Sequence, residues 1–174
     1  MTRAYETRLR ETRRMKRNMK RSILVLPLTF LASLAFISSA AAQGDLAVVV
    51  NSGNPAANIS RAELRKVLSG DQPFWPGGAR VKIILRAPGC RERTALLQFL
   101  RLSESEFKQR WTAQVVRGEV DTEPFVAPSI GMVLEAVRAL PGAVSLVSAA
   151  DLKPGMKVIK VDGLLPGAPG YPLH

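Results

Sequence analysis

Val81-Lys-Ile-Ile-Leu-Arg86-Ala-Pro-Gly89-Cys90-Arg91-Glu-Arg-Thr94 joins a β-branched run to an apolar-periodic helix through a short turn. Such a strand–turn–helix unit brings the unpaired backbone N–H groups and the partial positive charge of a helix start beside the turn. We expect Gly89 to lie just before the helix and Arg86 beside it, an arrangement suited to holding a phosphate-like group. The alternative interpretation is a turn with a purely structural role.

Strand and helix patterns alternate along the rest of the chain. The apolar run 46–50 is typical of a strand buried on both faces, and capping-box spacings at Ser60 and Ser103 predict two helix starts. Helices are predicted over 61–70, over 91–102, around Phe107, Trp111 and Val115, and from Pro128-Ser129 to Pro141-Gly142; further strands are predicted at 125–126, 143–147 and 157–161. The pattern indicates a single three-layer α/β lobe with a mostly parallel or mixed sheet, followed by an irregular tail from about residue 163.

The first 42 residues have the organisation of a secretory signal peptide. Lys20 and Arg21 precede an apolar run over 23–37, and Ala40 and Ala42 place the expected cleavage before Gln43. A retained membrane anchor is the alternative, but the run is too short and too interrupted for a typical span. A translation start at Met19 would give an ordinary signal sequence without the long basic leader. Since residue 43 is not a lipidatable cysteine, we expect a periplasmic protein that is not a lipoprotein and does not span the membrane after processing.

Charge and cysteine content narrow the function of the processed chain. The whole chain carries a net charge of +11, but nine of its 25 basic residues and two of its 14 acidic residues precede residue 43, so residues 43–174 carry only +4. No basic stripe with interleaved aromatic residues remains, which argues against nucleic acid as a partner. Cys90 is the only cysteine, so no disulfide can form within the chain. One domain of 132 residues is long enough to bury a core without one.

Three loops supply candidate ligand-binding residues, on the premise that ligands bind where strand ends and loops converge. Ser52 lies after the first strand, Arg86, Gly89, Cys90 and Arg91 follow the second, and Ser129 precedes the helix after the third. Their hydroxyls, backbone N–H groups and guanidinium are a donor-rich set that suits an oxyanion. The alternative is that each residue caps a helix or closes a turn.

The chain also resembles the substrate-binding proteins of phosphate ABC transporters, within the type II periplasmic binding protein superfamily. The resemblance covers about residues 46–161 and rests on Leu68-Ser-Gly70, a Trp-Pro loop, the strand and turn from Ile83 to Gly89, and Leu140-Pro-Gly-Ala-Val144. In that family the turn reads Arg-Ser-Asp-Gly-Ser-Gly-Thr, and its Arg, second Ser, Gly and Thr bind phosphate. Arg86 and Gly89 match this pattern, while Cys90, Arg91 and Glu92 replace the Ser, Gly and Thr. The Glu92 carboxylate would lie close to a bound anion unless it turns to solvent or pairs with Arg93. The resemblance implies one lobe of a two-lobed protein.

Catalysis has little support in these residues. The only histidine is His174, so a Cys–His or Ser–His pair and a metal site with regular ligand spacing are not indicated, and neither is a cofactor. We therefore expect a non-enzymatic protein. One hypothesis is a solute-binding protein for phosphate or a related small oxyanion that works with a membrane transporter or sensor. The other is a ligand-free interaction module for a membrane sensor, transporter or envelope protein.

Overall fold

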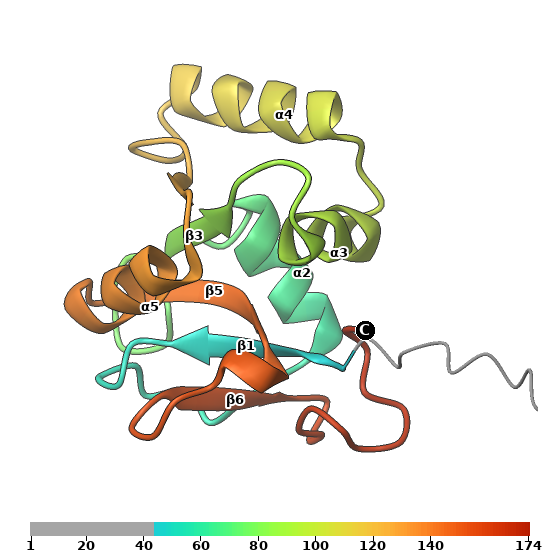
Figure 1. The fold of residues 1–174 in the computed structure, drawn as a ribbon. Helices are drawn as coiled ribbons and strands as arrows, with labels where there is room; N and C mark the ends of the chain where they lie inside the picture. Colours follow the sequence, from blue (N-terminus) through green and yellow to red (C-terminus); the bar gives the residue numbers. More distant parts are fainter. Residues whose placement is uncertain (1–43) are drawn as a thin grey trace, which may run out of the picture. The chain divides into compact units, whose positions relative to one another are not determined.

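The computed structural model describes residues 44–174, which belong to one compact unit (Figure 1). The predicted signal peptide at 1–42 and the alternative start at Met19 lie outside the described residues. Among the residues described, no helix combines the length and the apolar character needed to cross a membrane.

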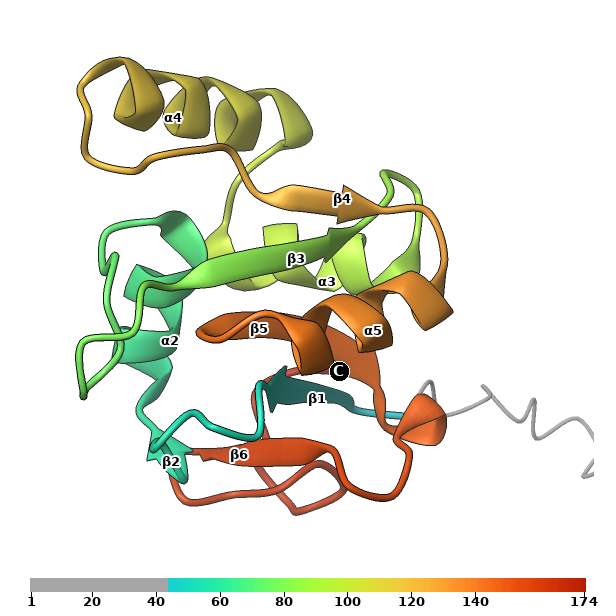
Figure 2. The same ribbon diagram turned by 90° about the vertical axis from the view of Figure 1, so that its left-hand side faces the viewer.

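Six strands form one mixed sheet with the order β2-β6-β1-β5-β3-β4 (Figure 2). The strands are β1 (Leu46–Val50), β2 (Asn58–Ile59), β3 (Lys82–Arg86), β4 (Phe125–Ala127), β5 (Ala143–Ser148) and β6 (Lys157–Val161). β1 runs antiparallel to both of its neighbours, β5 and β6, whereas every other neighbouring pair is parallel. The sequence-based prediction of an α/β lobe with a mixed sheet is therefore confirmed.

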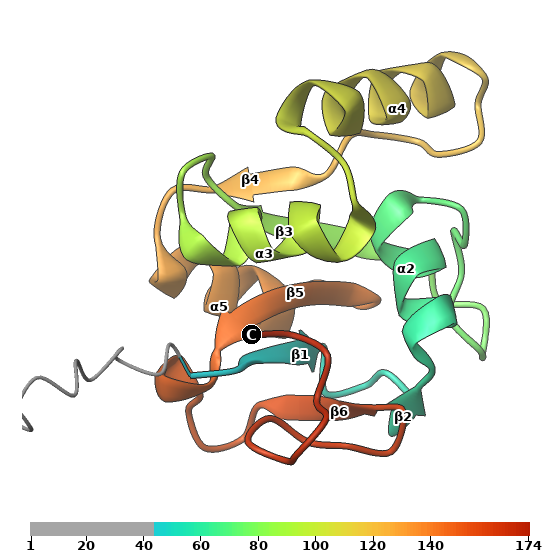
Figure 3. The ribbon, with the colours of Figure 1, turned by 90° about the vertical axis from the view of Figure 1, so that its right-hand side faces the viewer.

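Helices cover both faces of this sheet and give the lobe its three layers. They are α2 (Arg61–Ser69), α3 (Arg91–Leu100), α4 (Glu104–Val116) and α5 (Ile130–Ala139), with a short 3₁₀ helix, η1 (Ala149–Asp151), after β5. α2 and α3 lie on one face, α5 lies on the other, and α4 lies beyond the β4 edge (Figures 2 and 3). Both predicted capping boxes are present, at Ser60 with Glu63 and at Ser103 with Glu106.

The core consists of two apolar clusters separated by the sheet. Along β1 every side chain is buried, and alternate residues face opposite clusters, as the pleat of a strand requires. The larger cluster packs β1, β3 and β5 against α2, α3 and α4, and the smaller one packs the other sheet face against α5. The continuous apolar run 46–50 is thus explained by a strand covered on both sides.

The aromatic pair in the loop before β3 divides into one core residue and one surface residue. Trp75 is buried, and its indole N–H donates a hydrogen bond of 2.9 Å to the carbonyl of Gly142. Phe74 remains 47% exposed and stacks with the guanidinium of Arg80, whose carbon lies 4.9 Å from the ring centroid. The sequence suggests that Phe74 and Trp75 together cover the sheet as a hydrophobic plug. This expectation is correct for Trp75, which is buried, and wrong for Phe74, which stays exposed.

The segment after β6 contains no helix or strand, yet it is fixed to the core. Tyr171 and Leu173 are buried, and the backbone carbonyl of Leu173 accepts a hydrogen bond of 3.0 Å from the N–H of Leu46. Asp45 accepts bonds from the N–H of Gly167 and from the ring of His174, which lower the pKa of its carboxyl group. This tail therefore contributes to the larger core cluster.

The Tyr171 hydroxyl makes alkaline stability a test of this packing. Burial raises its pKa to about 12, and the hydroxyl donates a 2.8 Å hydrogen bond to the carbonyl of Leu46. Because the pKa is higher in the folded state than the usual value of about 10, its contribution is complete below pH 10 and is lost as the pH rises toward 12. We expect the free energy of unfolding to fall by about 2 kcal/mol across this window through this group.

Urea denaturation at half-unit pH steps measures this effect. Tyr171→Phe should be less stable than the native chain at pH 8 by about 1 kcal/mol because it lacks the hydrogen bond. Because phenylalanine does not ionise, the difference between the two proteins should reach zero near pH 11, and the variant should be the more stable protein by about 1 kcal/mol near pH 12. A difference in the free energy of unfolding that stays constant from pH 8 to pH 12 would show that the pKa of Tyr171 is not raised by folding.

Candidate functional site

The turn after β3 lies at the end of the sheet where β3, β4 and β5 all terminate. Arg86 is the last residue of β3 and pairs with Ala127 of β4. The backbone N–H of Cys90 donates a 3.2 Å hydrogen bond to the carbonyl of Ala87, which closes a turn with Pro88 and Gly89 at its centre. Gly89 has a φ of +86°, so the turn requires a residue that tolerates the left-handed region.

Immediately after this turn, α3 begins without a side-chain cap. Its N-cap residue, Cys90, makes no hydrogen bond to the first turn, whereas Ser60, Ser103 and Ser129 cap α2, α4 and α5. The Cys90 carbonyl accepts the first helical bond, from the N–H of Thr94. Because a thiol is a weak acceptor, the first backbone N–H groups of α3 keep their capacity to bind an external acceptor.

Arg86 lies beside this helix start with an incomplete set of hydrogen bonds. Its side chain is only 15% exposed, and its Nε and Nη1 atoms are buried without a hydrogen-bond partner among residues 44–174. The nearest carboxylate is that of Glu92, whose Oε2 lies 3.9 Å from Nε. This distance is an ion pair but exceeds hydrogen-bond length. The guanidinium therefore lacks acceptors that a bound oxyanion would supply.

Arg91 adds a second guanidinium at the same end of the sheet. Its Nη2 atom donates to the carbonyl of Gly44, while its Nε is buried without a partner. This contact is possible because β1 starts where β3 and β5 end, as the pairing of Leu46 with Ser148 shows. Arg91 therefore connects the turn to the beginning of β1.

The start of α5 meets the turn from the other face of the sheet. Ser129 follows β4 closely, and its Oγ accepts a 3.2 Å hydrogen bond from the N–H of Met132. Its hydroxyl hydrogen is not used in that bond and remains available as a donor. The pairing of Arg86 with Ala127 brings Ser129 to the same sheet end, so Arg86, Gly89, Cys90, Arg91 and Ser129 form one group.

Ser52 does not belong to this group, which corrects the expectation that three loops converge. β1 is antiparallel to β5 and thus to β3, so its carboxyl end lies at the opposite end of the sheet. There the N–H of Asn51 bonds to the carbonyl of Ala143, 3.1 Å away, at the start of β5. Ser52 is exposed at that distant end, and no contact joins it to the turn.

Asn51, which precedes Ser52, has a structural role in this arrangement. Its Nδ2 donates to the carbonyls of Val137 and Arg138 at 2.9 Å each, and its Oδ1 accepts from the N–H of Gly53 at 3.0 Å. The side chain therefore satisfies the free carbonyls at the end of α5. For this loop the alternative interpretation, a turn that caps a helix, is the correct one.

Glu92 is the site residue whose position the sequence left open. It neither turns to solvent nor pairs with Arg93, because Arg93 is buried and its Nε donates to Glu104 at 3.1 Å. This bond lowers the pKa of Glu104. Glu92 is 14% exposed and faces Arg86 instead. The sequence signal for this pairing is the position of Glu92 in the first turn of α3. Side chains in a helix lean toward its start, which here lies beside Arg86.

A metal site is not apparent in residues 44–174. In that range no group of three or more His, Cys, Asp or Glu side chains is placed to hold a metal ion. Cys90 is free and partly buried. The donors at the Arg86 end of the sheet therefore remain the principal candidate site.

The sequence has no match among models of protein families or among curated proteins. Solved structures do match. A protein assigned as a phosphate ABC transporter substrate-binding protein from Clostridium perfringens, solved with bound phosphate, is 17% identical with a TM-score of 0.56, and the match covers 70% of this chain and 46% of that one. An ABC-type phosphate transport receptor from Vibrio cholerae is 20% identical with a TM-score of 0.57, over 71% of this chain and 48% of that one.

PstS from Borrelia burgdorferi is similar as well, at 18% identity and a TM-score of 0.54, over 71% of this chain and 49% of that one. At these identities the comparisons show the fold. Residues 44–174 therefore share the fold of one part of these phosphate-transport proteins, as expected for a single type II periplasmic binding protein-like lobe, and the chain spans about half of their length.

Proposed function

We propose that this chain is an exported, periplasmic solute-binding protein that recognises phosphate or a related oxyanion at the Arg86 end of the sheet. The observation that carries the proposal is the uncapped start of α3 next to the Arg86 guanidinium, two of whose nitrogens are buried without acceptors. The phosphate bound in the structural neighbour from Clostridium perfringens supports this choice of ligand.

The available donors suit a tetrahedral anion. Backbone N–H groups at the start of α3 add their partial positive charge to the full charge of Arg86. Arg91 and the hydroxyl of Ser129 are further donors at the same end of the sheet. Hydrogen bonds from charged donors to oxyanions are among the strongest in proteins, and a guanidinium can supply two of them in parallel.

The openness of a site on one lobe favours a membrane partner. The match covers a little under half of each solved structure, so residues 44–174 correspond to only part of those proteins. A site on one lobe is open to water, where each charged hydrogen bond contributes less than in a closed cleft. A membrane transporter or sensor that covers the Arg86 end of the sheet would provide the missing wall.

Glu92 favours a second candidate, a ligand-free interaction module. Its carboxylate already lies 3.9 Å from the Arg86 guanidinium and partly neutralises it. In that case the same end of the sheet would contact a membrane sensor, transporter or envelope protein directly. The two candidates differ in whether the isolated protein binds an anion.

Isothermal titration calorimetry distinguishes them. The protein, purified from cells that express the full chain and freed of bound ions, is titrated with phosphate and separately with sulfate. Saturable phosphate binding with a dissociation constant in the micromolar range supports the solute-binding proposal. An absence of heat with either anion, from protein that unfolds cooperatively on heating, would favour the interaction module.

Glu92→Gln should strengthen phosphate binding. The substitution removes a negative charge near the anion while preserving the size of the side chain, so we expect about tenfold tighter binding at low ionic strength. The matched control is Glu135→Gln on the exposed part of α5, which should leave the affinity unchanged. Weaker binding by Glu92→Gln would instead mean that Glu92 holds Arg86 in its binding position.

A further inference from the structure

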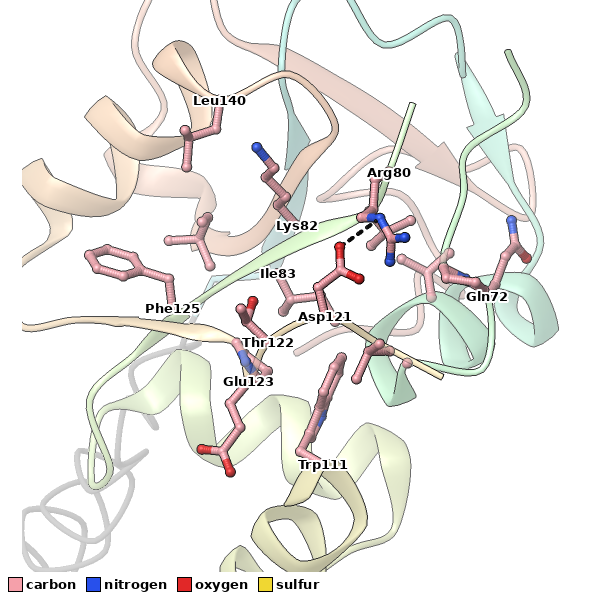
Figure 4. Close-up of a pocket in the computed structure, with 17 residues that line it drawn as sticks. Gln72, Arg80, Lys82, Ile83, Trp111, Asp121, Thr122, Glu123, Phe125 and Leu140 are labelled. Atoms are coloured by element: carbon pink, nitrogen blue, oxygen red, sulfur yellow. Dashed lines mark ion pairs between the residues drawn. The ribbon is translucent and has the colours of Figure 1, made fainter. Parts of the chain in front are cut away.

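A cavity of about 380 Å³ lies at the opposite end of the sheet from Arg86 (Figure 4). It is open to solvent on one side and is lined by the start of β3, the end of α2, the middle of α4 and the segment that leads into β4. The side chains on which the argument depends are Val67, Arg80, Lys82, Ile83, Trp111 and Val120. A volume of this size is in the range of small-molecule sites.

The topology explains why the cavity exists. β4 pairs with β3 only from Ile84 onward, so the first residues of β3 have no neighbouring strand on that side. The chain between α4 and β4 passes over this gap instead of filling it. α4 closes the space through Trp111, which belongs to the larger core cluster. The cavity is therefore a consequence of how the edge of the sheet is built.

One wall of the cavity is apolar and contains a buried hydrogen-bond donor. Val67, Ile83 and Val120 are buried, and Trp111 is only 5% exposed. The indole N–H of Trp111 has no hydrogen-bond partner among residues 44–174, although buried indole groups usually find one. The apolar wall suits a ligand that has an apolar body.

The charged groups at the rim leave one cation without an opposite charge. Arg80 forms an ion pair of 3.0 Å with Asp121, and Glu123 accepts a 2.9 Å hydrogen bond from Thr112. Lys82 makes no ion pair with any residue in 44–174. Figure 4 shows Lys82 on the side of the cavity opposite Trp111. A ligand that lies across the cavity could contact both.

We propose that this cavity binds a small apolar carboxylic acid of the size of a medium-chain fatty acid. The apolar body would lie against Trp111 and Ile83, where its burial removes apolar surface from water. The carboxylate would pair with Lys82 at the rim. This site is independent of the proposed phosphate site because the two lie at opposite ends of the sheet.

Nuclear magnetic resonance of the two indole N–H groups tests the proposal with the native protein. The chain has two tryptophans, and the indole of Trp75 already bonds to the Gly142 carbonyl. Titration with sodium octanoate should shift the Trp111 resonance saturably and leave that of Trp75 nearly unchanged. Octanol should bind about tenfold more weakly than octanoate, and acetate should not bind. An unshifted Trp111 resonance, or equal affinities for octanoate and octanol, would overturn the proposal.

Substitutions separate the two parts of the site. Lys82→Met preserves the length of the side chain and should weaken octanoate binding about tenfold without changing octanol binding. Lys160→Met, on the exposed side of β6, is the matched control. Val120→Trp should fill the cavity and abolish both. If a variant fails to fold, the titration of the native protein with octanoate and octanol still tests whether the cavity binds an apolar carboxylic acid. Lys82→Met should bind phosphate in calorimetry as the native protein does. A failure of the carboxylic-acid proposal can therefore be distinguished from a failure of the proposed phosphate-binding function.

Discussion

Replacing Gly142 with alanine is expected to lower the free energy of unfolding by about 4 kcal/mol. Gly142 has a φ of +80°, and an added Cβ atom would lie 1.9 Å from the backbone oxygen of Arg80. That neighbour is main chain and cannot rotate away. The Gly142 carbonyl also accepts hydrogen bonds from the Trp75 indole at 2.9 Å and from the N–H of Lys82 at 3.0 Å. Moving the turn to relieve the clash would therefore break the contact between β3 and β5.

Gly155→Ala is the matched control for this substitution. Gly155 has a nearly identical φ of +83°, but nothing lies within 4 Å of its added Cβ, so only the cost of the left-handed conformation remains. That cost is about 1 kcal/mol. Urea denaturation of the native chain and both variants measures the difference. Equal destabilisation by the two substitutions would show that the close approach to Arg80 has no energetic consequence.

The sequence was most informative where local chemistry alone determines the structure. At Ser60 and Ser103 a serine precedes a glutamate by three residues, and both capping boxes form as predicted because each involves only one helical turn. The strands at 46–50, 143–148 and 157–161 were likewise recognisable, since buried strands need continuous apolar runs. The two-residue β2 has no such signal and was missed.

Strand direction could not be obtained in the same way. A strand that is buried on both faces has the same apolar pattern whether its neighbours run parallel or antiparallel. The placement of Ser52 with Arg86 assumed that β1 runs parallel to β3. The observed antiparallel pairing of β1 with β5 separates them. The misplacement of Ser52 in the candidate site therefore comes from strand pairing and not from a wrong prediction of local structure.

The turn after β3 was predictable because strand, turn and helix are contiguous. The ion pairs around the turn were harder to predict, because they involve residues from another helix. Glu92 is left to pair with Arg86 only because Arg93 pairs with a different carboxylate. Arg93 pairs with Glu104, which lies in the next helix. Similarly, the helix around Phe107 and Trp111 was predictable, and both residues belong to the core, but a helical pattern gives no information about a cavity beside it.

Arg86→Met is expected to weaken phosphate binding by a factor of about 100 or more, if the proposed site is correct. Methionine fills a similar volume along the side chain but cannot donate a hydrogen bond. Stability should change by only about 1 kcal/mol, because the loss of two unpartnered buried nitrogens offsets the loss of the ion pair with Glu92. Calorimetry with phosphate and thermal unfolding measure the two effects separately. Arg138→Met, exposed in the last turn of α5, is the matched control.

Arg86→Lys then separates charge from geometry. Lysine preserves the positive charge near the start of α3 but lacks the planar fork that can hold two oxygens of one anion. If the guanidinium binds phosphate through two bonds, Arg86→Lys should lose about tenfold in affinity and lie between the native protein and Arg86→Met. If Arg86 contributes only its charge, Arg86→Lys should bind as tightly as the native protein. Unchanged binding by Arg86→Met would place the anion elsewhere, because its charge and its donors are then both dispensable.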